Sequence, residues 1–290
     1  MIHSVSFQHL PITKLHHGKI DQGMDSLAME EPLEIRVQYH SELGSTLKSI
    51  SVTMRTPGQD EDLALGFLFT EGIIQSIQQI QAVHHSLFAC AENKENTIQV
   101  VLSDGFTPNL QQAERNFYTT SSCGVCGKGS IESIKTVSQF TEIAANPFSL
   151  PSSLLMELPK RLRESQELFE LTGGLHASAL FDSQGNMMAM REDVGRHNAL
   201  DKLIGYAFKN NLLPLSHSVL LLSGRASFEL IQKASMAGIP IVAAMGAPSS
   251  LAVSLAAEMG ITLIGFLNAH RFNIYTQEHR ILLPIHENSH

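Results

Sequence analysis

The sequence predicts a three-layer α/β unit in the C-terminal half, preceded by a smaller α+β unit. In the C-terminal half, three apolar runs at 219–222, 240–244 and 262–266 recur at roughly twenty-residue intervals, with amphipathic helix patterns between them. Continuous apolar runs of this kind are typical of strands buried on both faces. Helical crossovers of this length join parallel strands with right-handed connections. We therefore expect a parallel βαβαβ unit.

Other segments complete this C-terminal unit. A helix is expected at 154–171. The strand patterns at 176–181 and 187–192 flank a polar turn, which predicts a hairpin. A helix with an apolar face follows at 199–208. The whole sheet is therefore mixed, with a hairpin followed by parallel strands.

The N-terminal unit is predicted from shorter patterns. Apolar and polar residues alternate at 33–37 and 50–54, and another strand pattern lies near 98–101. A helix is expected from Asp60 to Gly72, because the acidic residues in its first turn complement the helix dipole. We expect four segments. They are a poorly constrained leader at 1–30, a small α+β domain at 31–117, a mobile loop with a Cys-x-x-Cys pair at 118–130 and the main α/β domain at 131–290.

Composition excludes several classes of protein. The 290 residues carry a formal charge of −8, with 20 basic and 28 acidic residues, which argues against a general nucleic-acid binder. We find no signal-peptide pattern and no apolar run that approaches the roughly 18 residues of a membrane span. Three cysteines are too few for a disulfide framework in a chain of this length. We expect a cytoplasmic protein with free thiols and neither a membrane nor a nucleic-acid partner.

Cys123 and Cys126 lie in a Gly- and Ser-rich segment without apolar periodicity. Their two-residue spacing suits a metal site, a redox pair or sulfur chemistry. A structural zinc site usually needs four ligands, and the remaining cysteine, Cys90, is isolated in an apolar run. An exposed loop suits a sulfur carrier, and Lys128 can lower a thiol pKa through its charge. Spacing alone leaves all three chemistries open.

A second cluster surrounds the start of the helix that follows the hairpin. Arg191, Asp193, Arg196, His197 and Asn198 fall within eight residues there. Helix N-termini and arginine forks both bind phosphate, so the cluster predicts an anion site. The alternative is local helix capping by Asp193 with a surface ion pair.

Polar residues also follow successive buried strands. Each such segment alone is a weak signal, because serine is a common helix cap. In an α/β sheet, however, the carboxyl ends of the strands are where ligands bind. Together with the arginine cluster, these segments predict a phosphate-rich ligand site, and His176, beside two glycines, is a further candidate. The additional candidates are Ser223, Gly224, Arg225 and Ser249, with the segment 268–271 just past the last strand.

Five motifs in order closely resemble the FdhD family, the formate dehydrogenase accessory sulfurtransferases. They are Ser-Cys-Gly-Val-Cys-Gly, Thr-Gly-Gly-Leu-His-Ala-Ser-Ala, Arg-Glu-Asp-Val-Gly-Arg-His-Asn-Ala-Leu-Asp-Lys, Ser-Gly-Arg-Ala-Ser-Phe-Glu-Leu and Gly-Ala-Pro-Ser-Ser-Leu-Ala. The resemblance runs from about residue 30 to the C-terminus.

The resemblance implies a sulfurtransferase that accepts sulfur from a cysteine desulfurase as a cysteine persulfide. It passes this sulfur to the molybdenum cofactor, Mo-bis(molybdopterin guanine dinucleotide), which is required by formate dehydrogenase. Cys123 maps onto the family's persulfide carrier. Our hypothesis for Cys126 is that it assists sulfur release by forming a transient disulfide. The family's cofactor-binding stretch maps onto Phe266, Leu267, Asn268, Ala269, His270 and Arg271.

The resemblance also implies a cytidine-deaminase-like fold for the main domain. The zinc ligands of the deaminases are absent from the corresponding helix starts, so no structural metal is expected. Two rival functions stay open: a non-catalytic molybdenum-cofactor chaperone, and a zinc-stabilised binding module. The two-part architecture is compatible with a homodimer.

Overall fold

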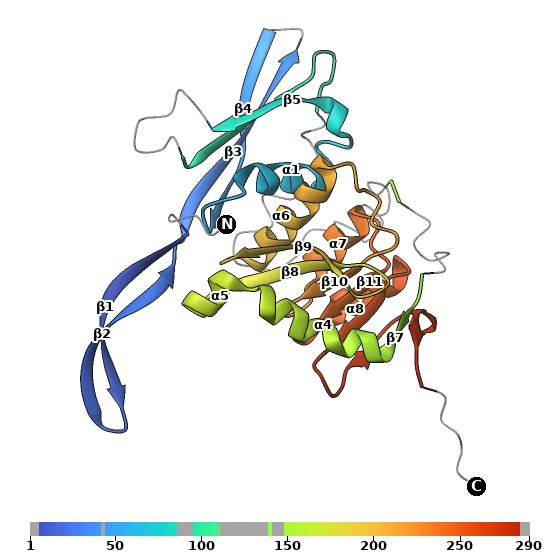
Figure 1. Ribbon diagram of the computed structural model, residues 1–290. Coiled ribbons are helices and arrows are strands. Elements are labelled where there is room, and N and C mark those ends of the chain that lie inside the picture. Colours follow the sequence, from blue (N-terminus) through green and yellow to red (C-terminus); the bar gives the residue numbers. More distant parts are fainter. Residues whose placement is uncertain are drawn as a thin grey trace.

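The computed structural model describes residues 6–41, 44–85, 95–108, 110, 139–140 and 148–284. The N-terminal unit is a four-stranded sheet, in the order β4-β3-β6-β5, packed on helix α1 (Figure 1). Its elements are β3 (Glu31–Ser41), β4 (Gly44–Arg55), α1 (Asp60–Thr70), the short 3₁₀ helix η1 (Ile77–Gln79), β5 (Ile80–His85) and β6 (Thr97–Leu102). These bounds confirm the predicted strands and helix. Strand β5 was not predicted, because its side chains are mostly exposed and it lacks an apolar alternation.

Residues 7–28 form a two-stranded antiparallel ribbon, so the expectation of a poorly constrained leader differs from the structure. Its strands are β1 (Phe7–His16) and β2 (Lys19–Ala28). His17 and Gly18 make the two-residue turn with positive φ angles of 50° and 78°, the conformation that hairpins favour. Most side chains of the ribbon are exposed on both faces, so no hydrophobic period marks it in the sequence. Figure 1 shows the ribbon extending away from the rest of the molecule.

The C-terminal unit is built on a six-stranded mixed sheet in the order β13-β12-β11-β10-β8-β9. Strands β10, β11 and β12 are parallel, and β8 and β9 form the predicted hairpin, with β8 antiparallel to β10. The strands are β8 (His176–Phe181), β9 (Met187–Asp193), β10 (Val219–Leu222), β11 (Ile241–Ala244), β12 (Thr262–Gly265) and β13 (Asn273–Ile274). This topology confirms the predicted hairpin and parallel βαβαβ order. The cytidine-deaminase-like description stays a prediction.

Helices cover both faces of this sheet. One face packs against α6, α7 and α8, and the other against α4. A small parallel pair, β7 with β14, lies beside the α4 face. The elements are β7 (Leu150–Pro151), α4 (Ser152–Ser165), α5 (Glu167–Thr172), α6 (Arg196–Lys209), α7 (Phe228–Met236), α8 (Ser250–Glu258), η4 (Glu278–Arg280) and β14 (Ile281–Leu282). Among the described residues, no helix is both long and apolar enough to cross a membrane.

The single helix expected at 154–171 is two helices, α4 and α5, which meet at Gln166. The break has a tertiary cause. The carboxylate of Glu192, on β9, accepts hydrogen bonds from the backbone N–H groups of Leu168 and Phe169 at 3.2 and 3.0 Å. A side chain from another element thereby caps the start of α5, a signal that local sequence does not contain.

The two units share one hydrophobic core, because α1 of the first packs directly on α6 of the second. Two glycines allow this contact. A Cβ atom at Gly66 would lie 1.9 Å from the carbonyl oxygen of Asp201, and one at Gly205 would lie 1.8 Å from that of Asp62. Only the absence of both side chains lets the helix backbones approach this closely. The N-terminal unit is therefore fixed against the helix that begins at the predicted anion site.

Candidate functional site

One edge of the C-terminal sheet gathers most of the predicted site residues. The parallel strands β10, β11 and β12 all end there. Because β8 runs antiparallel to β10, the hairpin contributes the first residue of β8 and the last of β9, His176 and Asp193, which are register partners. We call this region the carboxyl edge, and it comprises residues 176, 193–197, 223–227, 245–249 and 266–271.

Backbone hydrogen bonds connect the turns of the carboxyl edge beyond the ends of the strands. The Ser223 hydroxyl accepts from the N–H of Ala177 at 2.8 Å, and the N–H of Ser223 donates to the carbonyl of Ala177 at 3.0 Å. The N–H of Gly246 donates to the Gly224 carbonyl at 2.9 Å, and that of Phe266 to the Gly246 carbonyl at 3.0 Å. Adjacent turns are thus held in register with one another, which preorganises the edge for a ligand.

His176 packs against the backbone of Gly224. A Cβ atom at Gly224 would lie 3.2 Å from its Nδ1, so a larger residue there would displace the imidazole. Burial lowers the pKa of His176 below its ordinary value, and the charges of Arg196 and His197 add to this, while Asp193 opposes it. At neutral pH the ring is therefore mainly neutral and can both donate and accept a hydrogen bond.

Three arginines at the carboxyl edge are available to an anion. Arg225 and Arg271 are exposed, and Arg196 is partly buried at the first position of α6. The Nε of Arg196 is buried and has no hydrogen-bond partner. Within the described part of the chain, no carboxylate forms an ion pair with any of the three, whereas Arg55 pairs with Glu31 and Asp60, and Arg191 with Asp62. In a chain of net charge −8, these three arginines are a local concentration of positive charge.

His197 lies at the start of α6 and faces the start of α7. Its Nε2 is 3.3 Å from the Ser227 hydroxyl and 3.7 Å from a carboxylate oxygen of Glu229. The interaction with His197 lowers the pKa of Glu229 to about 2. Since both contacts use the same ring nitrogen, the three residues do not have the arrangement of a Ser-His-acid catalytic triad, in which the acid holds the other nitrogen. We interpret these contacts as interactions that connect the start of α6 to the start of α7.

The last predicted segments divide between surface and core. Ser249 caps α8, and its hydroxyl accepts from the N–H of Ala252 at 3.2 Å. The stretch 266–271 turns around Asn268, whose side-chain oxygen accepts from the N–H groups of His270 and Arg271 at 2.9 and 3.2 Å. Phe266, Ala269, His270 and Arg271 are exposed, whereas the side chain of Leu267 is 1% exposed and belongs to the core. Leu267 is therefore not open to a ligand.

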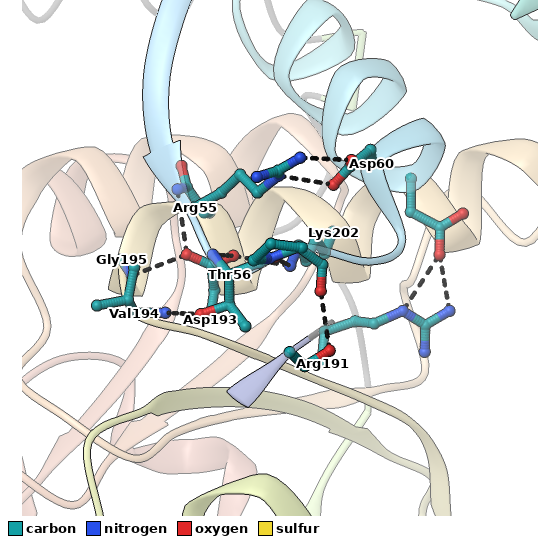
Figure 2. A network of polar contacts seen from close by, with 12 residues as sticks. Arg55, Thr56, Asp60, Arg191, Asp193, Val194, Gly195 and Lys202 are labelled. Carbon is teal, nitrogen blue, oxygen red and sulfur yellow. Dashed lines mark hydrogen bonds and ion pairs between the residues drawn. The ribbon is translucent and has the colours of Figure 1, made fainter. Parts of the chain in front are cut away.

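Asp193 belongs to the carboxyl edge and Arg191 lies two residues before it, but both side chains are engaged within the protein (Figure 2). The Nε and a terminal nitrogen of Arg191 donate to one carboxylate oxygen of Asp62, on α1, at 3.2 and 2.8 Å. Its guanidinium also stacks on Tyr206 at 4.5 Å from the ring centre. Asp193 is fully buried. The sequence predicted that these two residues bind a ligand. In the structure their side chains instead contact residues of the N-terminal unit.

Four donors saturate the Asp193 carboxylate. One oxygen accepts from the N–H of Gly195 at 2.8 Å and from Asn198 at 3.2 Å. The other accepts from the N–H of Thr56 at 3.1 Å and pairs with the buried Lys202 ammonium at 2.7 Å. Asn198 belongs to the cluster that the sequence predicted, whereas Thr56 and Lys202 were not singled out. The available signal was two polar residues four positions apart on the otherwise apolar face of α6.

Cys123, Cys126 and Cys90, and with them the predicted loop at 118–130, lie outside the described residues. Among the residues that the structure describes, no group of three or more His, Cys, Asp or Glu side chains could hold a metal ion. The zinc alternative, which depends on the two loop cysteines, is therefore untested.

The fold and the carboxyl edge define a class: a mixed α/β protein whose strand ends gather guanidinium groups that have no carboxylate partner among the described residues. The family model described as the FdhD/NarQ family matches residues 28–282. A sulfur carrier protein FdhD from Mycolicibacterium paratuberculosis is 50% identical over 273 residues, which is 93% of this chain and 97% of that one. Another, from Streptomyces avermitilis, is 48% identical over 274 residues, 94% of each chain. The chain belongs to the FdhD/NarQ family.

A solved structure agrees with the fold. The crystal structure of a protein from Desulfotalea psychrophila, described as a formate dehydrogenase accessory protein, is similar with a TM-score of 0.69. The match covers 95% of this chain and 99% of that one, at 22% sequence identity. At this identity the likeness concerns the fold.

Proposed function

We propose that this protein is a sulfur carrier that accepts persulfide sulfur from a cysteine desulfurase and delivers it to the molybdenum cofactor used by formate dehydrogenase. The acceptor is Mo-bis(molybdopterin guanine dinucleotide), which is the substrate of the transfer. Cys123 carries the sulfur, and the carboxyl edge holds the cofactor. The activity belongs in the cytoplasm, where thiols stay reduced.

The observation that best supports the cofactor site is that the three arginines have no carboxylate partner among the described residues. Arg196 matters most, because its buried Nε has no hydrogen-bond partner. The proposed ligand contains two pyrophosphates, and planar guanidinium groups bind phosphate oxygens through paired hydrogen bonds. The start of α6 adds backbone N–H groups and a favourable helix dipole. The curated relatives, which are named sulfur carriers, support the sulfur chemistry.

Loading is a thiol exchange on sulfur. The Cys123 thiolate attacks the terminal sulfur of the desulfurase persulfide. A new S–S bond forms on Cys123, the S–S bond of the desulfurase breaks, and its cysteine leaves as a thiolate. No external electrons are needed.

Release as sulfide requires two electrons, and Cys126 can supply them. Its thiolate attacks the Cys123 sulfur that bears the persulfide, forming a Cys123–Cys126 disulfide and expelling hydrosulfide toward the molybdenum. A dithiol reductant then restores both thiols. The two-residue spacing of the cysteines is suited to this disulfide.

A cofactor chaperone is the second candidate, because the described geometry concerns the binding of an anion and would serve delivery without sulfur transfer. The two candidates differ in their need for Cys123. If Cys123→Ala still activates formate dehydrogenase in cells, the chaperone is favoured.

Intact-mass measurement after incubation with a desulfurase and cysteine tests the sulfur step. The wild-type protein should gain one sulfur, about 32 Da, which a reductant removes. Cys123→Ala should not gain it, whereas the matched variant Cys126→Ala should load and then retain its sulfur. Equal loading of Cys123→Ala and wild type would contradict the proposal.

A further inference from the structure

The β9–α6 turn is held by the N-terminal unit. This turn, residues 193–196, carries Arg196 to the carboxyl edge. The hydroxyl of Thr56, just after β4, accepts from the N–H of Val194 at 3.2 Å. The N–H of Thr56 donates to Asp193, and its carbonyl accepts from the ammonium of Lys202 at 2.8 Å. All three polar groups of this one residue are therefore committed to the turn and its support (Figure 2).

Asn198, on α6, makes two hydrogen bonds to the end of β4. Asn198 donates to the carbonyl of Met54 at 2.7 Å and accepts from the hydroxyl of Thr53 at 3.1 Å. Asn198 also donates to Asp193, so the helix start, the turn and the end of β4 belong to one hydrogen-bond network. Thr56, Asp193 and Lys202 are each at most 1% exposed. Water does not compete for these bonds, so each missing partner would be costly.

We infer that Thr56, Asp193 and Lys202 are positioning residues that set the orientation of Arg196 at the carboxyl edge. The N-terminal unit, which contributes no residue to the edge itself, thereby controls ligand affinity there. The inference rests on the proposed function, because it takes the carboxyl edge as a phosphate-binding site.

The interface offers a matched control at a second buried network. Asp201 pairs with the Lys233 ammonium at 3.0 Å, and the Thr70 hydroxyl donates to Asp201 at 2.9 Å and accepts from Lys233 at 2.9 Å. Thr70 and Thr56 are both buried threonines of the N-terminal unit that hydrogen-bond to a buried Asp–Lys pair of the C-terminal unit. Thr70 does so through its hydroxyl, and Thr56 through its backbone N–H and carbonyl. Thr70, at the end of α1, makes no hydrogen bond to the β9–α6 turn among the described residues.

The test compares Thr56→Val, Thr56→Ser and Thr70→Val. Valine keeps the shape of threonine but puts a methyl group where Val194 needs an acceptor, so the turn must shift, whereas serine keeps the acceptor. Unfolding by denaturant first establishes that each variant is folded. The probe for affinity is guanosine diphosphate, the nucleotide fragment of the proposed cofactor, measured by calorimetry.

Thr56→Val should weaken binding about tenfold, whereas Thr56→Ser and Thr70→Val should bind like wild type. The NMR titration of His176 is a second readout that needs no ligand. In Thr56→Val its pKa should move up toward the ordinary value, because Arg196 no longer lies in place beside it. Unchanged affinity and unchanged His176 titration in Thr56→Val would overturn the inference, as would equal changes in Thr70→Val. If wild type does not bind guanosine diphosphate, the proposed cofactor site fails, and the His176 titration alone still decides the positioning role.

Discussion

Replacing Gly205 by alanine tests the contact that joins the two units. The added Cβ would lie 1.8 Å from the carbonyl oxygen of Asp62, whereas ordinary contact begins at 3.4 Å. The backbones of α1 and α6 must therefore separate locally by about 1.6 Å. Overpacking of this kind costs about 1–3 kcal/mol, and the backbone atoms involved offer no rotamer that relieves it. Because the clash is with backbone atoms, the upper end of this cost, about 3 kcal/mol, applies. Alanine returns up to about 1 kcal/mol through helix propensity, so we expect a net loss of about 2 kcal/mol.

Denaturant unfolding measures this loss directly. Gly205→Ala should lower the transition midpoint without a change in slope. Gly174→Ala is the control, because an added Cβ there has its nearest neighbour at 3.8 Å, and it should stay within about 0.5 kcal/mol of wild type. A Gly205→Ala protein as stable as wild type would refute the close helix contact.

Two further predictions concern charged groups. Lys202→Met should cost about 3 kcal/mol of unfolding free energy, because it leaves the buried Asp193 carboxylate without its ammonium partner, and Lys202→Met combined with Asp193→Asn should recover part of that loss. If the double variant is less stable than Lys202→Met, the pairing argument is wrong. His176 has a folded-state pKa below its ordinary value of 6.5, so the unfolded chain binds its proton more readily. Its contribution to stability is therefore greatest above pH 6.5 and declines as the pH falls from 6.5 through the folded-state pKa. The stability difference between wild type and His176→Gln, measured by unfolding at several pH values, should follow this course, and a difference independent of pH would contradict it.

The sequence was most informative where burial and topology act locally. The sequence predicts a strand at Val219–Leu222 because this run is apolar throughout, as expected for a strand that is buried on both faces. Once the strand order is known, the gathering of Ser223, Ser249 and Phe266 at one edge follows from parallel topology.

Other features depend on distant partners that no local pattern contains. The sequence around Asp193 predicts a polar turn, but it does not distinguish a carboxylate that binds a ligand from one that accepts a hydrogen bond from the N–H of Thr56. Thr56 lies 137 residues away in the chain. The break at Gln166 results from capping by Glu192. The β1–β2 ribbon shows no alternation of apolar and polar residues, because neither of its faces is buried against a core.

The binding of guanosine diphosphate to wild type, Arg196→Gln and Arg36→Gln tests the central claim about the carboxyl edge most directly. Both substitutions remove one positive charge, but Arg36 already pairs with Glu34 at 2.6 Å on the N-terminal sheet. Wild type and Arg36→Gln should bind equally, and Arg196→Gln should bind at least tenfold more weakly, since it loses a charge-assisted contact to phosphate. Equal affinity of Arg196→Gln and wild type would contradict the assignment of the carboxyl edge as the cofactor site.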